Sequence, residues 1–253
     1  MFFTQFPINM TRRESRAMLA SPYRMHAAIA GSFPPSQASG DGRVLWRVDR
    51  MPGGGSRLYI VSPGKPSLVG LDEQIGWPDC EPQWGTRGYD PFLGRISNGQ
   101  TYSFRLVANP SLNRSTRGGR SDLLNSEGEP KRNRIGHLTI LEQTAWLVGA
   151  QAYKGTDKEV PSIFAPERGS RAQRNGFEVL SDDEGCPSLI VSNSNRISFT
   201  KGVQGNKVTF ARAQYDGVLR VTDADALRHA LAYGIGHAKG FGCGLLTLVP
   251  LDR

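Results

Sequence analysis

The stretch GIGHAKGFGCGLL, residues 234–246, constrains the fold of this chain most, because its glycines follow a predicted helix and precede a predicted strand. Its five glycines are Gly234, Gly236, Gly240, Gly242 and Gly244. A phosphate-binding glycine loop has the opposite order, strand, loop and helix, so that the phosphate meets a helix N-terminus. Here a phosphate would face a helix C-terminus, where the helix dipole is unfavourable. The order of elements therefore argues against a nucleotide-binding loop.

Two explanations of these glycines remain, and they are compatible. In the first, Gly234 ends the helix as its C-cap, and the other glycines permit bulges and close packing against a sheet. In the second, the bare backbone approaches a nucleic-acid backbone closely, with His237 and Lys239 lining the approach.

The first half of the chain has the strand and helix order β-α-β-β-α-β, which is the ferredoxin-like pattern. Helix 11–33 starts at a capping box formed by Thr11 and Glu14, and Pro22 ends or kinks it. The predicted elements are strand 2–10, helix 11–33, strands 43–51 and 56–63, helix 66–76 and strand 100–112.

The second half repeats this order, with helix 139–153, strands, a helix and a closing strand. Thr222 is the expected cap of the helix at 222–236. A polar, basic stretch at 109–134 predicts the junction, which gives domains 1–130 and 131–253. The further strands are expected at 176–183, 187–202, 206–221 and 244–251. The predicted fold class is α+β, with tandem ferredoxin-like (RRM-like) domains that are each a helix-backed antiparallel sheet.

The charge of the chain indicates a nucleic-acid partner. Its net charge is +8, its pI is about 9.7, and most of its 31 basic residues are arginine. Arginine presents a planar fork to phosphate and also stacks on bases. Arginine-rich codon usage explains the ratio of arginine to lysine, but not the excess over 23 acidic residues. The basic clusters lie at 105–134, at 168–174 and beside a hairpin turn; for each, a solvated surface is the alternative.

Cysteine and hydropathy patterns predict a cytoplasmic protein. Cys80, Cys186 and Cys243 are widely spaced and odd in number, which favours neither a disulfide framework nor a zinc site. No apolar run reaches the length that spans a bilayer, and the apolar N-terminus lacks the basic residues of a secretory signal. We therefore expect no membrane partner.

The chain has four histidines, and His26 is the main candidate for proton transfer. His237 is either a second proton-transfer group or an exposed loop residue, His229 is expected to be structural or solvated, and His137 is given no role. Tyr23 and His26 stand three residues apart, so on a helix they share one face. Packing at a helix end is the alternative role for this pair. The acidic run at 182–184 resembles a solvated turn more than a Mg²⁺ site, and no metal or other cofactor is expected.

Several stretches resemble, in order, the CasE family of CRISPR-associated endoribonucleases of the type I-E Cascade complex, over nearly the whole chain. They are the first strand and helix with Tyr-x-x-His, SFRLVANPSLNRS, GEPKRNRIGHLTILEQTAWL, NGFEVL, FARAQYDGVLRVTDADALRHALAYGIG and GIGHAKGFGCGLLTLVP. The resemblance implies two tandem ferredoxin-like domains and metal-independent cleavage of CRISPR precursor RNA at the base of the repeat hairpin. It also implies that the protein stays bound to its product and joins the other Cascade subunits.

The resemblance assigns the family's catalytic Tyr and His to Tyr23 and His26. Such cleavage uses the 2′-OH of the RNA as nucleophile, so His26 serves as general base or acid, and Tyr23 orients it or contacts the phosphate. Family members can carry a catalytic Lys shortly after the His, but HAAIAGSF has none. Arg12, Arg24 and Lys239 are the candidate substitutes.

The residues expected to bind RNA are basic residues and one histidine near these elements. They are Arg24, Arg117, Arg120, Lys131, Arg132, Arg134, Lys201, Lys207, His237 and Lys239. The segment 154–175 is longer than the family pattern predicts. Because the Lys is missing, a non-catalytic RNA-hairpin-binding subunit of the same fold remains an alternative. A ferredoxin-like protein-interaction module without a nucleic-acid role is the third hypothesis.

Overall fold

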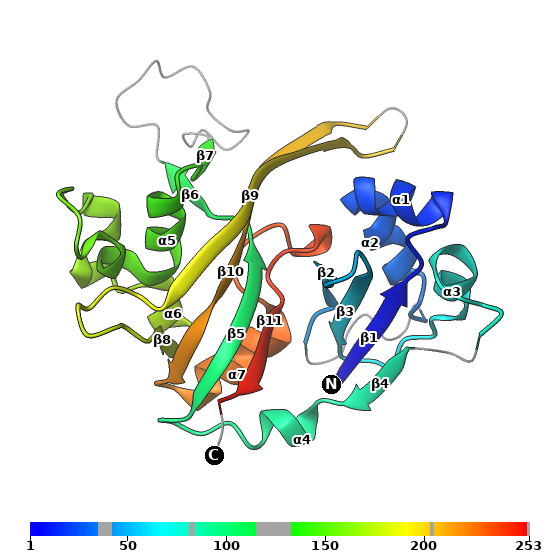
Figure 1. The fold of residues 1–253 in the computed structure, drawn as a ribbon, viewed down its shortest axis with the longest axis horizontal. Coiled ribbons are helices and arrows are strands. Elements are labelled where there is room, and N and C mark those ends of the chain that lie inside the picture. The colour runs from blue at the N-terminus through cyan, green and yellow to red at the C-terminus, as the bar shows by residue number, and fades with distance from the viewer. Residues whose placement is uncertain (35–41, 81–83, 115–132, 203–204, 252–253) are drawn as a thin grey trace, which may run out of the picture.

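The structure is a computed structural model that describes residues 1–34, 42–80, 84–114, 133–202 and 205–251. Two antiparallel sheets lie side by side, each with its own helices, and the short helix α4 (Asp90–Leu93) lies in the connection between them (Figure 1). The predicted fold class is confirmed. In the described ranges, no helix has the length and apolar character needed to cross a membrane.

The first sheet has the order β2-β3-β1-β4, in which every pair of neighbours is antiparallel. Helices between its first and second strands and between its third and fourth strands complete the ferredoxin-like pattern. The strands are β1 (Phe2–Ile8), β2 (Leu45–Arg50), β3 (Ser56–Ser62) and β4 (Gly85–Gly88), and the helices are α1 (Arg13–Ala20), α2 (Pro22–Ala30) and α3 (Val69–Ile75). Phe6 of β1 and Leu58 of β3 face each other in the register and are fully buried under Met25 and Ile29 of α2.

The second sheet has the order β11-β5-β10-β8, and β9 also pairs with β10. Its strands are β5 (Thr101–Ala108), β8 (Phe177–Val179), β9 (Leu189–Thr200), β10 (Lys207–Val221) and β11 (Leu246–Pro250). Its helices are α5 (Ile140–Val148) and α7 (Ala224–Tyr233), and Trp146, Phe177, Tyr215 and Leu227 are in its core. The ends of β9 and β10 form a long hairpin that reaches toward α1 and α2 of the first domain (Figure 1).

Short elements fill the connections of the second domain. Strands β6 (Ser111–Arg114) and β7 (Asn133–Gly136) pair with each other between β5 and α5. The segment expected to be a long polar loop at 154–175 contains three short helical elements. The short helical elements are η2 (Gly149–Tyr153), η3 (Ser162–Phe164), η4 (Pro166–Arg168), α6 (Arg171–Arg174) and η5 (Lys239–Phe241).

The structure differs from the sequence prediction in the strand that closes the first sheet. The expectation that residues 100–112 play this part is wrong, because β5 pairs with β10 and β11 in the second sheet. The first sheet is closed instead by β4, a four-residue strand with glycine at both ends, which pairs with β1. The sheets therefore divide the chain between β4 and β5, earlier than the predicted boundary of 130/131.

Two predicted helix caps also differ. Thr11 does not cap α1, because its backbone and hydroxyl bond Asn9 and the helix begins after Arg12 without a side-chain cap. Helix α7 is capped by Asp223, whose carboxylate accepts two backbone amides, and not by Thr222. The break predicted at Pro22 is confirmed, since α1 ends there and α2 begins.

Candidate active site

Helix α2 carries both predicted catalytic side chains. Ser21 caps the helix by accepting the amide of Arg24, and Pro22 occupies the first helical position, where no amide donor is needed. Tyr23 is 38% exposed, whereas His26 is half-buried. The spacing of three residues directs both side chains to the same side of the helix, so the phenol is open to a ligand beside a sheltered imidazole.

The wall against which His26 lies is the glycine-rich loop of the other domain. A methyl group at Gly240 would lie 3.4 Å from Nε2 of His26, so the imidazole rests directly on bare backbone. The ring of Phe241 meets the imidazole edge-on, with 6.5 Å between ring centroids. Nδ1 is buried and has no hydrogen-bond partner among the described residues. The site is thus assembled from two domains.

The protonation state of His26 follows from this position. Burial lowers the pKa of His26 below its ordinary value of 6.5, and the positive charge of Arg43 lowers it further. The imidazole is therefore neutral at pH 7 and able to accept a proton. An uncharged histidine beside a cation suits a general base in a site that binds an anion.

The glycines of the loop are explained by close packing, as the first of the two sequence hypotheses expects. Gly234 ends α7 with a φ of +77°. Methyl groups at Gly236 and Gly242 would approach Trp146 to 3.0 Å and Trp46 to 2.8 Å. The loop therefore fits between a tryptophan of each domain, and only glycine leaves enough room.

Two of the three candidate substitutes for the missing Lys are engaged elsewhere. Arg24 forms an exposed ion pair with Glu14 of α1. The guanidinium of Arg12 donates to the backbone carbonyls of Asp72 and Glu73 in α3, at 3.3 and 2.6 Å. Neither arginine is available to the imidazole as a free cation.

The third candidate, Lys239, belongs to the loop that contacts His26. It precedes Gly240 directly, and its stem packs against Gly244. Burial lowers the pKa of Lys239, and the positive charges of Arg43 and Arg171 lower it further. Arg43 thus acts on both His26 and Lys239. Arg43 is not predicted from the sequence, because a lone arginine at the start of a predicted strand carries no signal of what it faces.

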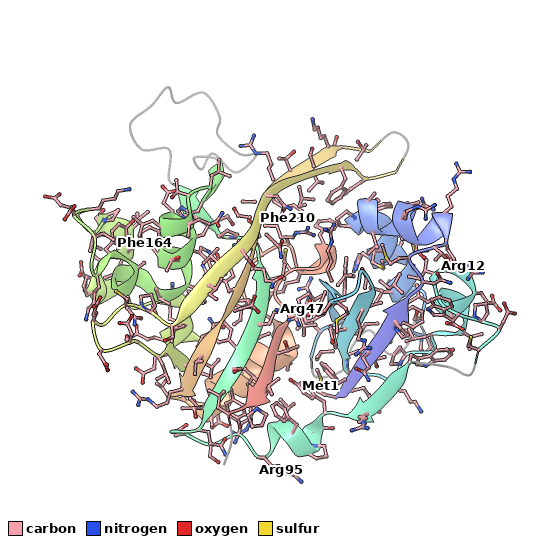
Figure 2. The ribbon with its side chains drawn as sticks, viewed as in Figure 1. Met1, Arg12, Arg47, Arg95, Phe164 and Phe210 are labelled. Atoms are coloured by element: carbon pink, nitrogen blue, oxygen red, sulfur yellow. The ribbon has the colours of Figure 1, made fainter. Side chains whose placement is uncertain are left out.

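The hairpin of β9 and β10 packs onto the same loop through three phenylalanines. Phe199 and Phe210 lie with ring centroids 4.9 and 6.1 Å from that of Phe241. The ammonium of Lys201 stands over Phe241, 5.6 Å from the ring centroid. This cluster joins the hairpin, which carries the predicted RNA-binding residues Lys201 and Lys207, to the loop behind His26 (Phe210 is labelled in Figure 2).

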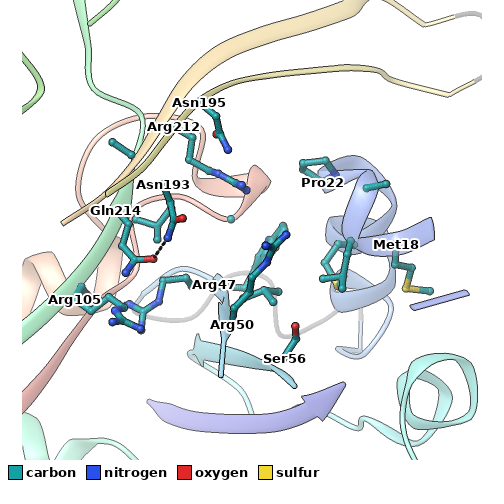
Figure 3. A pocket seen from close by; sticks show the side chains of 18 of the residues that line it. Met18, Pro22, Arg47, Arg50, Ser56, Arg105, Asn193, Asn195, Arg212 and Gln214 are labelled. Carbon is teal, nitrogen blue, oxygen red and sulfur yellow. Dashed lines mark hydrogen bonds between the residues drawn. The ribbon is translucent and has the colours of Figure 1, made fainter. Parts of the chain in front are cut away.

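A cleft of about 560 Å³ opens between the two sheets, and arginines dominate its polar side (Figure 3). Among the residues described, no carboxylate lines this cleft. The arginines that line it are Arg16, Arg47, Arg50, Arg105 and Arg212.

Arg47 fastens the two domains at the base of this cleft (Figures 2 and 3). It is 3% exposed and forms a two-pronged ion pair with Asp49, at 2.6 and 2.9 Å. Its remaining donors reach the carbonyls of Arg105 and Leu245 and the hydroxyl of Thr247, all in the second domain. This arginine is fully satisfied and serves the fold.

The other predicted residues have different placements. Arg117, Arg120, Lys131 and Arg132 lie outside the described residues, and Arg134 is described only as part of the backbone of β7. His237 lies in the glycine-rich loop and is half-buried. His137 is buried against Phe164, and His229 stacks on Tyr233. The described ranges contain no group of three His, Cys, Asp or Glu residues that could hold a metal ion.

Comparison with known proteins identifies the family to which this chain belongs. A family model described as CRISPR associated protein matches residues 1–250. The CRISPR-associated endoribonuclease Cse3 of Thermus thermophilus is 26% identical over 255 residues, which span 99% of this chain and 100% of that protein. The CRISPR system Cascade subunit CasE of Escherichia coli is 30% identical over 148 residues, covering 58% of this chain and 57% of that protein.

A solved structure shares the fold. The CRISPR endoribonuclease Cse3 bound to a 19-nucleotide RNA superimposes with a TM-score of 0.70 at 23% identity, covering 99% of this chain and 100% of that one. With two ferredoxin-like domains closed around a glycine-rich loop, and a family match over almost its whole length, the chain belongs to the CRISPR-associated protein family. Within that family, the resemblance to the CasE branch of type I-E, which includes Cse3, is confirmed.

Proposed function

We propose that this chain is a metal-independent endoribonuclease that cleaves CRISPR precursor RNA at the base of the repeat hairpin. One observation carries the proposal. His26 is a half-buried imidazole whose pKa is lowered by burial and by Arg43, and it rests on the glycine-rich loop where the domains meet. The naming of Cse3 as a CRISPR-associated endoribonuclease supports the same activity for this relative.

In the proposed mechanism, neutral His26 accepts the proton of the 2′-OH on the nucleotide before the cut. The freed oxygen attacks the adjacent phosphorus and the bond to the 5′-oxygen breaks. The products are a 2′,3′-cyclic phosphate and a 5′-hydroxyl, whose proton comes from a general acid. The exposed phenol of Tyr23 donates a hydrogen bond to the scissile phosphate. The substrate supplies the nucleophile, so the reaction needs no metal-bound water.

Positive charge next to His26 replaces that of the missing Lys. The charge of Arg43 disfavours the imidazolium, and together with Lys239 on the contacting loop it stabilises the additional negative charge of the phosphorane. Arg43 thus helps to keep the base unprotonated, and both cations lower the barrier.

The β9–β10 hairpin is proposed to hold the RNA stem. Lys201 and Lys207 supply charge for its phosphates, and the phenylalanine cluster joins the hairpin to the loop behind His26. Because the relative CasE is named as a Cascade subunit, we propose that this chain stays on its hairpin product inside an antiviral surveillance complex with other type I-E subunits.

The test is incubation with a CRISPR repeat RNA in EDTA. We expect cleavage to persist in the chelator and to stop when the 2′-OH before the cut is replaced by hydrogen. His26→Ala should slow cleavage by about 10²- to 10⁴-fold while RNA binding is kept. His229→Ala, which alters a histidine stacked on Tyr233, is the matched control and should cleave normally. Equal rates for both variants would refute the site assignment.

The same experiment decides the second candidate, a non-catalytic RNA-hairpin-binding subunit. The absence of a lysine from residues 27–33 favours that candidate. Tight binding of the repeat RNA without any cleavage, in EDTA or in Mg²⁺, would establish it.

A further inference from the structure

Arg171, the first residue of α6, occupies an unusual position for a cation. Its guanidinium stacks over the indole of Trp146, 4.4 Å from the ring centroid. Trp146 is 3% exposed and lies on α5, so the indole forms a firm floor under the guanidinium. A stacked guanidinium loses little conformational freedom when it binds a ligand, and the planar fork of a guanidinium matches the geometry of an oxyanion.

The charge of Arg171 is not neutralised. Among the described residues, no carboxylate pairs with it, and its buried Nε has no hydrogen-bond partner. Burial, together with the charge of Arg174, lowers its pKa to about 10. A desolvated cation without a counterion is costly, and a bound anion would relieve that cost.

The position of Arg171 continues the cationic wall of the active site. The glycine-rich loop touches Trp146 at Gly236 and His26 at Gly240, so the same short segment joins both places. Lys239 lies on this segment, and the charges of both Arg43 and Arg171 lower its pKa. Three cations from separate parts of the chain thus act on one another near His26 and Trp146.

We infer that Arg171, with Lys239 and Arg43, forms a second phosphate site, which binds the backbone of the RNA strand that leaves the scissile phosphate on the side away from the hairpin stem. This inference rests on the proposed function, because that function places the scissile phosphate at His26. At the base of a hairpin, the stem lies on one side of the cut and a single strand on the other. The β9–β10 hairpin faces the stem, which leaves this cationic wall for the single strand.

The site gives the enzyme a way to favour an uncut precursor over its own product. The precursor still has the flanking strand and would contact Arg171, whereas the hairpin product has lost it. Because single-strand phosphate contacts release counterions, this preference depends on salt.

The experiment compares two uncleavable repeat RNAs that carry a 2′-deoxy nucleotide before the cut. One ends at the scissile phosphate, and the other continues for several nucleotides. We expect the longer RNA to bind more tightly to the unaltered protein. Arg171→Gln should weaken its binding by about five- to tenfold and reduce the salt slope by about 0.7, while hairpin affinity changes less than about twofold.

A second variant guards against misfolding, since Arg171 also covers Trp146. Arg43 is exposed, and among the described residues it hydrogen-bonds through its backbone amide alone, so we expect Arg43→Gln to keep the fold. It should weaken the binding of the longer RNA more than that of the shorter RNA, which keeps only the contact of Arg43 with the scissile phosphate. Arg95→Gln, an exposed arginine at the opposite end of the molecule, is the charge-matched control (Figure 2). Equal losses for Arg95→Gln and Arg171→Gln would overturn the inference.

Neutral methylphosphonates in the flanking strand identify the ligand as RNA phosphate. They should weaken binding to the unaltered protein and have little further effect on Arg171→Gln. Additive losses would mean that Arg171 binds something else, and a flank that adds no affinity would mean that it only covers Trp146. In both cases hairpin binding and cleavage would continue. Failure of the proposed function would instead abolish cleavage of every repeat RNA by the unaltered protein.

Discussion

Two groups of cations lie where the domains meet, and they differ in whether carboxylates neutralise them. In the cleft between the sheets, Arg47 and Arg105 are neutralised by Asp49 and Asp216 and by backbone carbonyls. Around the glycine-rich loop, the corresponding cations have no carboxylate partner in the described part of the chain. Arg47 already makes every hydrogen bond that its guanidinium can make, whereas Arg171 has a buried Nε without a partner among the described residues.

This difference separates an arginine that holds the fold from the cations that we propose bind RNA. A buried guanidinium with every donor satisfied orients two domains, but offers nothing to RNA. A half-buried cation without a counterion stores unfavourable energy that an incoming phosphate releases. Net charge alone does not distinguish the two groups, because both add equally to it.

The largest loss of stability should come from replacing Arg47, whose guanidinium makes all of its hydrogen bonds within the protein. Arg47→Met removes five hydrogen bonds and leaves Asp49, which is 6% exposed, without its main partner. We expect the free energy of unfolding in urea to fall by about 3–5 kcal/mol. Replacing Asp49 by Leu as well should recover much of this loss, because no carboxylate then stays buried. A double variant less stable than Arg47→Met would contradict this account of the pair.

A smaller loss of stability should distinguish two glycines of the glycine-rich loop, Gly242 and Gly240. Gly242→Ala places a methyl group 2.8 Å from Trp46 at a φ of +79°, which should cost about 1–3 kcal/mol of stability.

Its counterpart Gly240→Ala should spare the fold and impair cleavage. The methyl group would only touch His26, at 3.4 Å from Nε2, but it would cover the proton-accepting edge. Thermal unfolding and single-turnover cleavage of both variants test this contrast. A Gly240→Ala variant that unfolds at a lower temperature but cleaves RNA at the normal rate would contradict it.

The cations around the glycine-rich loop should also affect how the cleavage rate depends on pH. Cleavage that needs neutral His26 should fall as the pH drops through a pKa below 6.5. Arg43→Gln removes a positive charge that lowers this pKa, so the acidic limb should move to higher pH. The rate at pH 6 should therefore decline more steeply than the rate at pH 8. Arg95→Gln should leave the limb in place, and a shift toward lower pH in Arg43→Gln would contradict the assignment.

The smallest effect should come from a pair that is neutralised but exposed. Arg24 and Glu14 bond across α1 and α2 at the surface. Glu14→Gln should change the free energy of unfolding by less than about 1 kcal/mol, because water and salt screen such a pair. It frees Arg24, however, so RNA binding at low salt should tighten slightly and return to normal at high salt. Binding that tightens equally at all salt concentrations would exclude this explanation.

The sequence predicts most elements of the fold, because hydrophobic periodicity and helix-breaking or turn residues are local signals. Strands β1 and β3 and the break at Pro22 follow from their own residues. The assignment of β5 to a sheet failed, since pairing depends on partners more than a hundred residues away. Strand β4 was missed because Gly-Thr-Arg-Gly has neither alternation nor β-branched enrichment beyond one threonine.

The active site is less predictable than the fold. Tyr23 and His26 are assigned by family resemblance, and their spacing supports a shared face without showing what opposes it. Arg43 and the stack of Arg171 on Trp146 depend on how two domains meet. The pattern of residues in the sequence does not show whether an arginine has a carboxylate partner. Arg47 has one, and Arg171 has none among the described residues.

The loop that shelters His26 belongs to the other domain, so the surroundings of the imidazole depend on how the two domains dock. If the domains moved apart, the imidazole would be in water and would lose the burial that lowers its pKa. The proton affinity of this one side chain therefore reports whether the two domains are in contact.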